Sequence, residues 1–215
     1  MNIPIFPLQL IVFPGESLNL HIFEQKYRQL FADLKSGSIT FFGIPPVVDH
    51  QMHAFGTRLI LTDIVKNYPG GEMDVSTQGI DVFKLGGILA NGGQKLYAEA
   101  TVDLITHDSS YDFLKFEELR GLYLEFQDLM AAQKEIDVVD GDGYSFKIAH
   151  YIGLSEVQKL ALLEIVSEFD RQDYLIQHLK LIIPSMRNIK ETQARITANG
   201  YFKNLKSFNF TQGES

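Results

Sequence analysis

The sequence predicts an α+β protein in which a β-rich N-terminal part is followed by a helical C-terminal part. Before about residue 108, short segments rich in β-branched and aromatic residues alternate with Gly, Pro and Asn, which is typical of strands joined by tight turns. After that point, apolar residues recur at steps of three and four, as on one face of a helix. We therefore expect a β-rich domain over residues 1–108, a helical domain over 109–210 and a free tail over 211–215.

Five segments of the N-terminal half carry strand signals. They are Ser38–Pro45, Thr57–Tyr68, Gly71–Gly79, Gly79–Leu89 and Lys95–Ile105. One helix is expected among them, over residues 23–37, because four apolar residues have helical spacing and Gly37 can end the helix. These four are Tyr27, Leu30, Phe31 and Leu34. Several short strands with few helices between them favour a mainly antiparallel sheet or barrel.

Two turns are predicted between these strands. In Tyr68-Pro69-Gly70-Gly71, Pro69 presets one turn position and Gly70 can supply positive φ at the next. Asn91-Gly92-Gly93 is the second turn.

The C-terminal half predicts four helical segments. The first follows Ser109 and Asp112, which are spaced as a capping-box variant. A short helix over residues 144–153 should end at Gly153, and the Ser155–Gln158 capping box should open the next. Asp170 can cap a long helix that Pro184 should kink or end, with a further segment reaching about Gly200.

Composition excludes several classes of protein. There is no cysteine, which excludes disulfides, thiolate metal sites and cysteine nucleophiles and fits a reducing compartment. No basic leader opens the chain, and no apolar run reaches the roughly 20 residues needed to span a bilayer. We expect a cytoplasmic protein with no membrane partner.

The charge distribution argues against nucleic acid as the main partner. The formal net charge is −8, which opposes binding by counterion release. The segment Lys180–Phe210 nevertheless has one acidic residue, Glu191, against six basic ones: Lys180, Arg187, Lys190, Arg195, Lys203 and Lys206. Such a run is typical of a solvated helix face, and an acidic partner or RNA stays as the alternative.

Each catalytic or metal-binding pattern fails on a specific residue. Gly87 and Gly92 have the glycine spacing of a phosphate loop, but Gly93 and Gln94 stand where Lys and Ser or Thr are needed. His50 and His53, beside Asp49, lack the glutamate of a zinc helix and fit a surface loop. The loop Asp137–Gly143 has the wrong acidic spacing for calcium. His150 and His178 lie on apolar helix faces and fit hydrogen-bonded core histidines.

His21, Glu24 and Arg28 form the remaining polar cluster. His21 and Glu24 could pair for acid–base work, but no second acid or nucleophile accompanies them. Glu24 and Arg28 are spaced as an ordinary helix-surface ion pair. We expect this cluster to orient a strand–helix junction, with Phe23, Tyr27 and Phe31 packed under the sheet. No enzyme, catalytic residue, metal or cofactor is predicted, and the residues that contact a partner cannot be assigned from the sequence.

The opening "IPIFPLQLIVFPGESLNLHIFEQKYRQLF" resembles the start of the Lon substrate-binding domain, the N-terminal domain of ATP-dependent Lon proteases. The matching residues are Pro4, Phe6, Pro7, Leu8, Phe13, Pro14, Gly15, Leu20, His21, Ile22, Phe23, Glu24, Tyr27 and Arg28. A softer match covers Leu154–Leu179, and the resemblance spans residues 3 to 183. Gln25, Lys26 and Val82 depart from the residues the family commonly has there.

The resemblance implies a PUA-like pseudo-barrel followed by a C-terminal helical bundle. It also implies a non-catalytic module that binds unfolded or exposed hydrophobic polypeptide, as an adaptor or recognition factor for a separate ATP-dependent protease. We expect a stand-alone member of the family without its ATPase and protease modules. The alternative is a PUA-like RNA-binding protein that uses the basic C-terminal segment.

Overall fold

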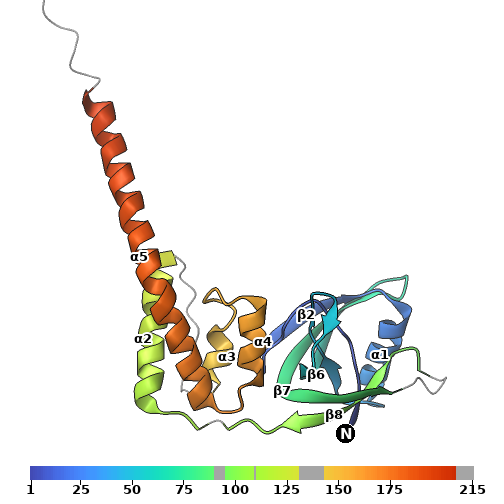
Figure 1. The fold of residues 1–215 in the computed structure, drawn as a ribbon. Coiled ribbons are helices and arrows are strands. Elements are labelled where there is room, and N and C mark those ends of the chain that lie inside the picture. The colour runs from blue at the N-terminus through green and yellow to red at the C-terminus, as the bar shows by residue number, and fades with distance from the viewer. Residues whose placement is uncertain (90–94, 109, 131–142, 207–215) are drawn as a thin grey trace, which may run out of the picture.

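A closed β-barrel and a set of helices lie side by side in the computed structural model (Figure 1), which describes residues 1–89, 95–108, 110–130 and 143–206, the last part from residue 198 as backbone only. The main sheet has the strand order β1-β8-β7-β6-β3, with every pair antiparallel, and β2 pairs with β7 off this path. The strands are β1 (Asn2–Pro4), β2 (Ser17–Ile22), β3 (Phe42–Ile44), β6 (Phe55–Asn67), β7 (Met73–Leu89) and β8 (Glu99–Ile105). The predicted fold class is confirmed.

The barrel closes where the chain after β1 meets β3. Ile5 forms a parallel bridge with Gly43, and the Phe6 amide donates to the Gly43 carbonyl over 2.8 Å. The Ile5 amide donates in the opposite direction, to Ala98, over 2.9 Å. A side chain at Gly43 would lie 2.7 Å from the Phe83 ring, so the strands can approach only because this residue is glycine.

The strand β7 corrects one prediction. Gly71–Gly79 and Gly79–Leu89 were expected as two strands, but Met73–Leu89 is one continuous strand. Gly79 permits a close backbone approach instead of a turn: its amide donates to Glu16 and its carbonyl accepts from Gly15, each over 2.9 Å. A Cβ at this position would lie 2.5 Å from the Phe13 carbonyl oxygen.

The turn between β6 and β7 lies where the sequence predicts it, but a different glycine takes the positive φ. The Gly71 amide donates to the Tyr68 carbonyl over 2.9 Å, which confirms the predicted turn between β6 and β7. Positive φ falls on Gly71 (84°) and not on Gly70. Gly15, in the Phe13-Pro14-Gly15 turn, has φ 81°. The predicted turn at residues 91–93 lies outside the described residues. So does the end of the Gly87–Gly92 segment that was compared with a phosphate loop.

Five helices are described, and they match most of the predicted segments. They are α1 (Gln25–Ser36), α2 (Phe113–Met130), α3 (Tyr144–Ile148), α4 (Glu156–Glu164) and α5 (Glu168–Lys206). Gly37 ends α1 in the left-handed conformation, and Gly153 follows α3 with φ 73°. The Ser155–Gln158 capping box is confirmed, with both of its hydrogen bonds formed.

Several helix boundaries differ from the prediction. The helix α3 ends at Ile148 and not at Gly153. Asp112 itself caps α2, accepting from the Lys115 amide over 3.0 Å, while Ser109 lies outside the described residues. Ser167 and not Asp170 stands at the start of α5, where its hydroxyl accepts from the Asp170 amide. The helix α5 also continues through Pro184 to Lys206.

The barrel and the helices share a core cluster. Ile11, Phe13 and Val82 of the barrel region pack into the same buried cluster as the helical side chains. The Phe13 and Phe146 rings stack with centroids 5.3 Å apart, and Glu16 lies 3.0 Å from Nε2 of His150. These contacts hold the turn before β2 against α3.

Candidate functional site

His21 and Arg28, but not Glu24, tie β2 and α1 to the turn end of the β6–β7 hairpin. His21 Nδ1 lies 2.6 Å from one Asp74 oxygen, and the Tyr68 hydroxyl donates to the other over 2.8 Å. These bonds, the one from His21 first, lower the pKa of Asp74. Arg28 donates to the Gly70 carbonyl in the turn over 2.5 Å. The side chains therefore fix the junction of strand, helix and hairpin.

Two details of this cluster differ from the prediction. Glu24 pairs with Lys26 over 3.1 Å and not with Arg28, which is occupied by the turn. Phe23 does not pack under the barrel, because it precedes the helix and is 59% exposed. Phe6 stacks on Tyr27 instead, with ring centroids 3.8 Å apart.

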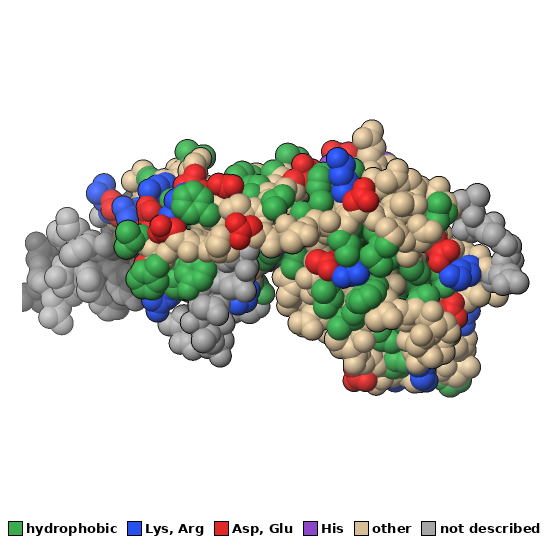
Figure 2. All heavy atoms as spheres, turned by 90° about the horizontal axis from the view of Figure 1, so that it is seen from below, with side chains coloured by type: hydrophobic (Ala, Val, Ile, Leu, Met, Phe, Trp, Pro, Cys, Tyr) green, Lys and Arg blue, Asp and Glu red, His purple; other side chains and the backbone are tan. Residues whose placement is uncertain are grey.

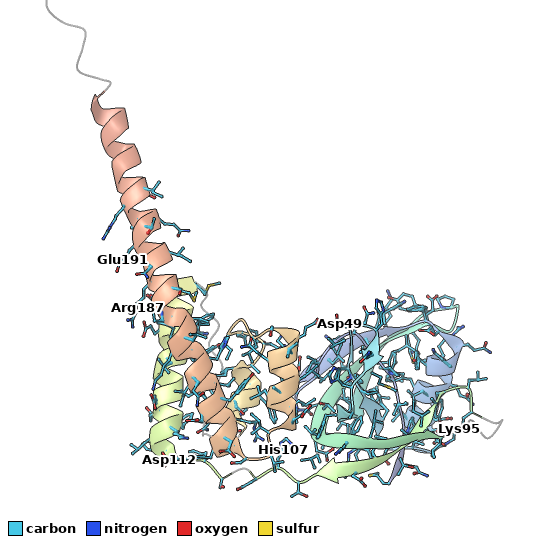
Figure 3. All side chains as sticks on the ribbon, viewed as in Figure 1. Asp49, Lys95, His107, Asp112, Arg187 and Glu191 are labelled. Atoms are coloured by element: carbon cyan, nitrogen blue, oxygen red, sulfur yellow. The ribbon has the colours of Figure 1, made fainter. Side chains whose placement is uncertain are left out.

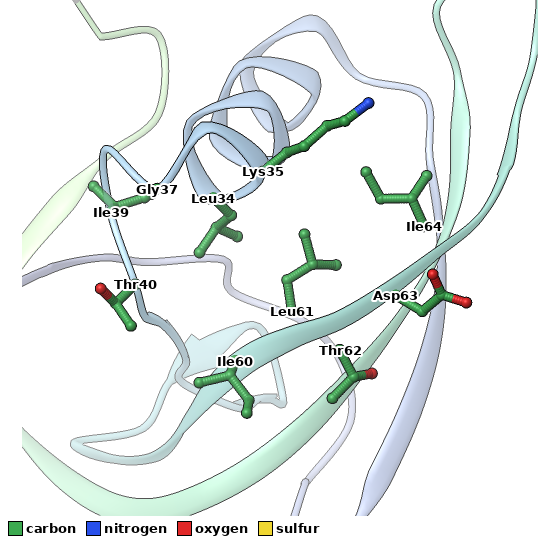
Figure 4. A pocket seen from close by; sticks show the side chains of 10 residues that line it. All are labelled: Leu34, Lys35, Gly37, Ile39, Thr40, Ile60, Leu61, Thr62, Asp63 and Ile64. Carbon is green, nitrogen blue, oxygen red and sulfur yellow. The ribbon is translucent and has the colours of Figure 1, made fainter.

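A hollow of about 630 Å³ lies between α1 and β6, and we name it the α1–β6 groove (Figure 4). Its apolar lining comes from Leu34, Ile39, Ile60, Leu61 and Ile64, and its polar lining from Lys35, Thr40, Thr62 and Asp63, with Gly37 between them. Leu34 closes the base from α1, while Leu61 and Ile64 reach toward it from β6 (Figure 4). The groove is large enough to hold an apolar side chain with part of its backbone.

A second hollow, of about 350 Å³, is lined by residues of β2, β6 and β7. Its lining includes His21, Asp74 and Val65, of which Val65 is 62% exposed. Both hollows therefore include residues of β6 that lie beyond the part of this strand that pairs with β3. No sequence signal pointed to either, because their walls come from segments distant in the chain.

Among the described residues, the other histidines do not gather into a metal site. Asp49 and His50 are the two tip residues of a hairpin between β4 (Val47–Val48) and β5 (Gln51–Met52), and both have positive φ. Within the described residues, no group of three or more His, Asp or Glu side chains is placed to hold a metal ion.

His150 and His178 are hydrogen-bonded, as predicted. His150 lies beside Glu16, and Nε2 of His178 lies 2.8 Å from the Ile152 carbonyl. The Asp137–Gly143 loop falls, apart from Gly143, outside the described residues.

Three of the six cations in the basic C-terminal segment are paired with acids of α2. Three cations of α5 pair with acids of α2: Lys180 with Glu118, Arg187 with Glu125 and Lys190 with Asp128. The residue numbers rise together along both helices, so α2 and α5 run parallel (Figure 1). Figure 2 shows the basic and acidic side chains of the helical part interleaved on the face in view. Described residues thus offer no continuous basic stripe to a nucleic acid.

A buried polar network, missed by the sequence analysis, joins the helices to the β8–α2 connection. Arg171 donates to Ser145, to the Ile165 and Val166 carbonyls and toward His107. His107 lies where the chain leaves the barrel (Figure 3). Burial first, and then the Arg171 charge, lower the pKa of His107 to about 4.

None of the described helices combines the length and the hydrophobicity that a membrane crossing requires.

The architecture is that of the N-terminal domain of a Lon protease. A Lon N-terminal domain protein from Xanthomonas campestris superposes with a TM-score of 0.64 at 21% identity, covering 82% of this chain and 98% of that one. The N-terminal domain of the Mycobacterium avium complex Lon protease gives 0.62 at 16% identity, covering 84% and 98%. At these identities the likeness shows the fold. A search of curated proteins found no match.

The model of the ATP-dependent protease La (LON) substrate-binding domain matches residues 2–181. The chain therefore belongs to the LON substrate-binding domain family, which is a non-catalytic module. The resemblance predicted from residues 3 to 183 is confirmed.

Proposed function

We propose that this protein binds unfolded polypeptide, or hydrophobic segments exposed on a damaged protein, without acting on them chemically. The observation that carries the proposal is the family match over residues 2–181. The α1–β6 groove supports it, since an open apolar hollow on a barrel is a surface on which a polypeptide side chain can be buried. In this proposal the chain also acts as an adaptor or recognition factor for a separate ATP-dependent protease.

Binding is tested with a polypeptide that cannot fold. Fluorescently labelled, reduced and carboxymethylated α-lactalbumin is titrated with the purified chain, and native α-lactalbumin serves as the matched control. We expect anisotropy to rise for the unfolded form alone. Equal binding of both forms, or of neither, would contradict the proposal.

The adaptor role needs a separate test. Tagged protein is used to recover partners from the cytosol of its own organism, with and without nuclease, and the recovered proteins are identified by mass spectrometry. We expect an ATP-dependent protease whose recovery is unchanged by nuclease. That protease, once purified, should degrade unfolded α-lactalbumin faster when the chain is added. Recovery of RNA-bound material that nuclease removes would favour the RNA-binding alternative.

A further inference from the structure

We propose that the free edge of β6, beside the α1–β6 groove, takes an extended segment of a non-native polypeptide as an added antiparallel or parallel strand. The inference rests on the proposed polypeptide-binding function and assigns it a place and a mode of binding. The occupant is a short segment with alternating apolar side chains that also carries charged residues.

The first support is the unpaired edge itself. β3 pairs with β6 only at Thr57, Arg58 and Leu59. On its other side, β6 continues in register with β7 as far as Asn67. From Ile60 to Asn67, the edge of β6 that faces away from β7 has no partner strand among the described residues. Free backbone amides and carbonyls along such an edge can pair with another chain.

The chain before β3 is held away from this edge. Gly37 takes the left-handed conformation (φ 77°), and the Ser38 and Ile39 amides both donate to the Asp33 carbonyl at the end of α1. These bonds hold the chain at the end of α1, and residues 37–40 then line one side of the groove while β6 lines the other (Figure 4). The gap between the two walls is the space that an added strand would enter.

The groove provides a site for a side chain. Leu34, Leu61 and Ile64 surround the hollow next to the free edge (Figure 4). Alternate side chains of a strand project from the same face. A segment paired with β6 would therefore direct one apolar side chain into the hollow and the next toward solvent.

Charge complementarity favours a polypeptide as the occupant. Lys35 on α1 and Asp63 on β6 are exposed on opposite walls, and neither forms an ion pair with another described residue. A peptide can present a cation to Asp63 and an anion to Lys35. The charges of a nucleic acid are all negative phosphates, which Asp63 would repel.

The irregularity of β6 favours a short segment over a second copy of this chain. The pairing with β7 shifts register between Leu61 and Asp63 and again between Ile64 and Lys66. Such bulges bend a strand and discourage edge-to-edge association of two preformed sheets. A flexible peptide can follow the bend, whereas the edge of a folded sheet cannot.

The experiment uses the full chain and fluorescein-labelled peptides in which valine and threonine alternate. One peptide has lysine at both ends and another has glutamate. Two further isomers of each carry N-methyl groups on one or the other alternate set of amides, which removes the hydrogen-bond donors from one edge at a time. The variants are Asp63→Lys and Lys35→Glu, with Asp103→Lys as the control, since Asp103 is an exposed strand residue on β8. Circular dichroism verifies that each variant is folded.

Strand addition predicts an asymmetric result. One N-methylated isomer should bind roughly tenfold more weakly than the parent peptide, while the other keeps its affinity, because only one edge of the peptide faces β6. Asp63→Lys should weaken the lysine peptide about two- to fivefold and Lys35→Glu the glutamate peptide by a similar factor. Asp103→Lys should change neither.

Three outcomes would overturn the inference, and they can be told apart. If unfolded α-lactalbumin binds but both N-methylated isomers keep their affinity, or Asp63→Lys and Asp103→Lys behave alike, the function stands and this site is wrong. If neither α-lactalbumin nor the peptides bind, the proposed function fails as well. If sedimentation shows a dimer that Asp63→Lys dissociates, the edge belongs to a second copy of the chain.

Discussion

The carboxylate of Glu168 and the guanidinium of Arg171 form an ion pair, 2.8 Å long, in which neither side chain is more than 2% exposed. The Ser145 hydroxyl donates to the Glu168 carboxylate over 2.7 Å, and the Ser145 backbone amide donates to the same carboxylate over 3.1 Å. The remaining Arg171 donors reach the α4–α5 connection and His107. The pair therefore fixes α3, α5 and the chain leaving the barrel relative to one another.

Arg171→Met should be strongly destabilising, because it leaves the Glu168 carboxylate buried without its cation. The expected loss in the free energy of unfolding is about 3–5 kcal/mol. Urea denaturation followed by circular dichroism measures it. Lys180→Met, which removes one member of an exposed ion pair with Glu118, is the matched control and should cost less than about 1 kcal/mol. Equal losses in the two variants would refute the role assigned to burial.

His107 should make the stability depend on pH between about 4 and 6.5. Its pKa is lowered to about 4 in the folded protein, so the unfolded chain binds a proton on His107 first as the pH falls. The stability is therefore full above pH 6.5 and declines toward pH 4. We expect the free energy of unfolding to be on the order of 2 kcal/mol lower at pH 5 than at pH 8. His107→Gln should flatten this part of a urea-midpoint profile, and a slope left unchanged would exclude His107 as its source.

Gly79→Ala should destabilise the barrel, since the added methyl group would lie 2.5 Å from the Phe13 carbonyl oxygen. A cost of about 1–3 kcal/mol is expected from such overpacking. Gly121→Ala is the control with the opposite sign, because Gly121 lies within α2 and a Cβ there would meet nothing within 4 Å. That change should stabilise the protein by about 1 kcal/mol. Thermal denaturation of the two variants should shift in opposite directions.

Ser155→Ala should weaken α4 by removing the acceptor for the Gln158 amide. The expected loss is about 1 kcal/mol in the free energy of unfolding. Ser155→Asp keeps an acceptor at the same position and adds a charge that suits a helix N-terminus, so it should retain most of the stability. The prediction is wrong if both variants lose the same amount in urea denaturation.

The cations of α5 should become available to polyanions when their partners on α2 are neutralised. The triple variant Glu118→Gln, Glu125→Gln and Asp128→Asn removes the three acids paired with Lys180, Arg187 and Lys190. We expect it to elute from a heparin column at higher salt than the native chain, because three more cations can release counterions. Identical elution would show that these ion pairs do not restrain the basic segment.

Local signals in the sequence determined most of the element boundaries. Gly37 ends α1 in the left-handed conformation, and Ser155 and Gln158 form their capping box. These predictions succeeded because each depends on residues a few positions apart. The predictions that failed concern neighbouring residues that can take the same structural position. Ser167 begins α5 where Asp170 was expected, and Gly71 takes the positive φ expected at Gly70.

Only the tertiary structure decided which segments meet. The Ile5–Gly43 bridge closes the barrel, the backbone at Gly79 approaches Phe13 within a continuous β7, and the Glu168–Arg171 pair collects hydrogen-bond partners from three separate segments. The free edge of β6 exists because β3 is short and the chain before it is held at the end of α1. Composition and spacing do not encode such relationships directly, since strand pairing and the neutralisation of charges are settled by contacts between residues far apart in the chain.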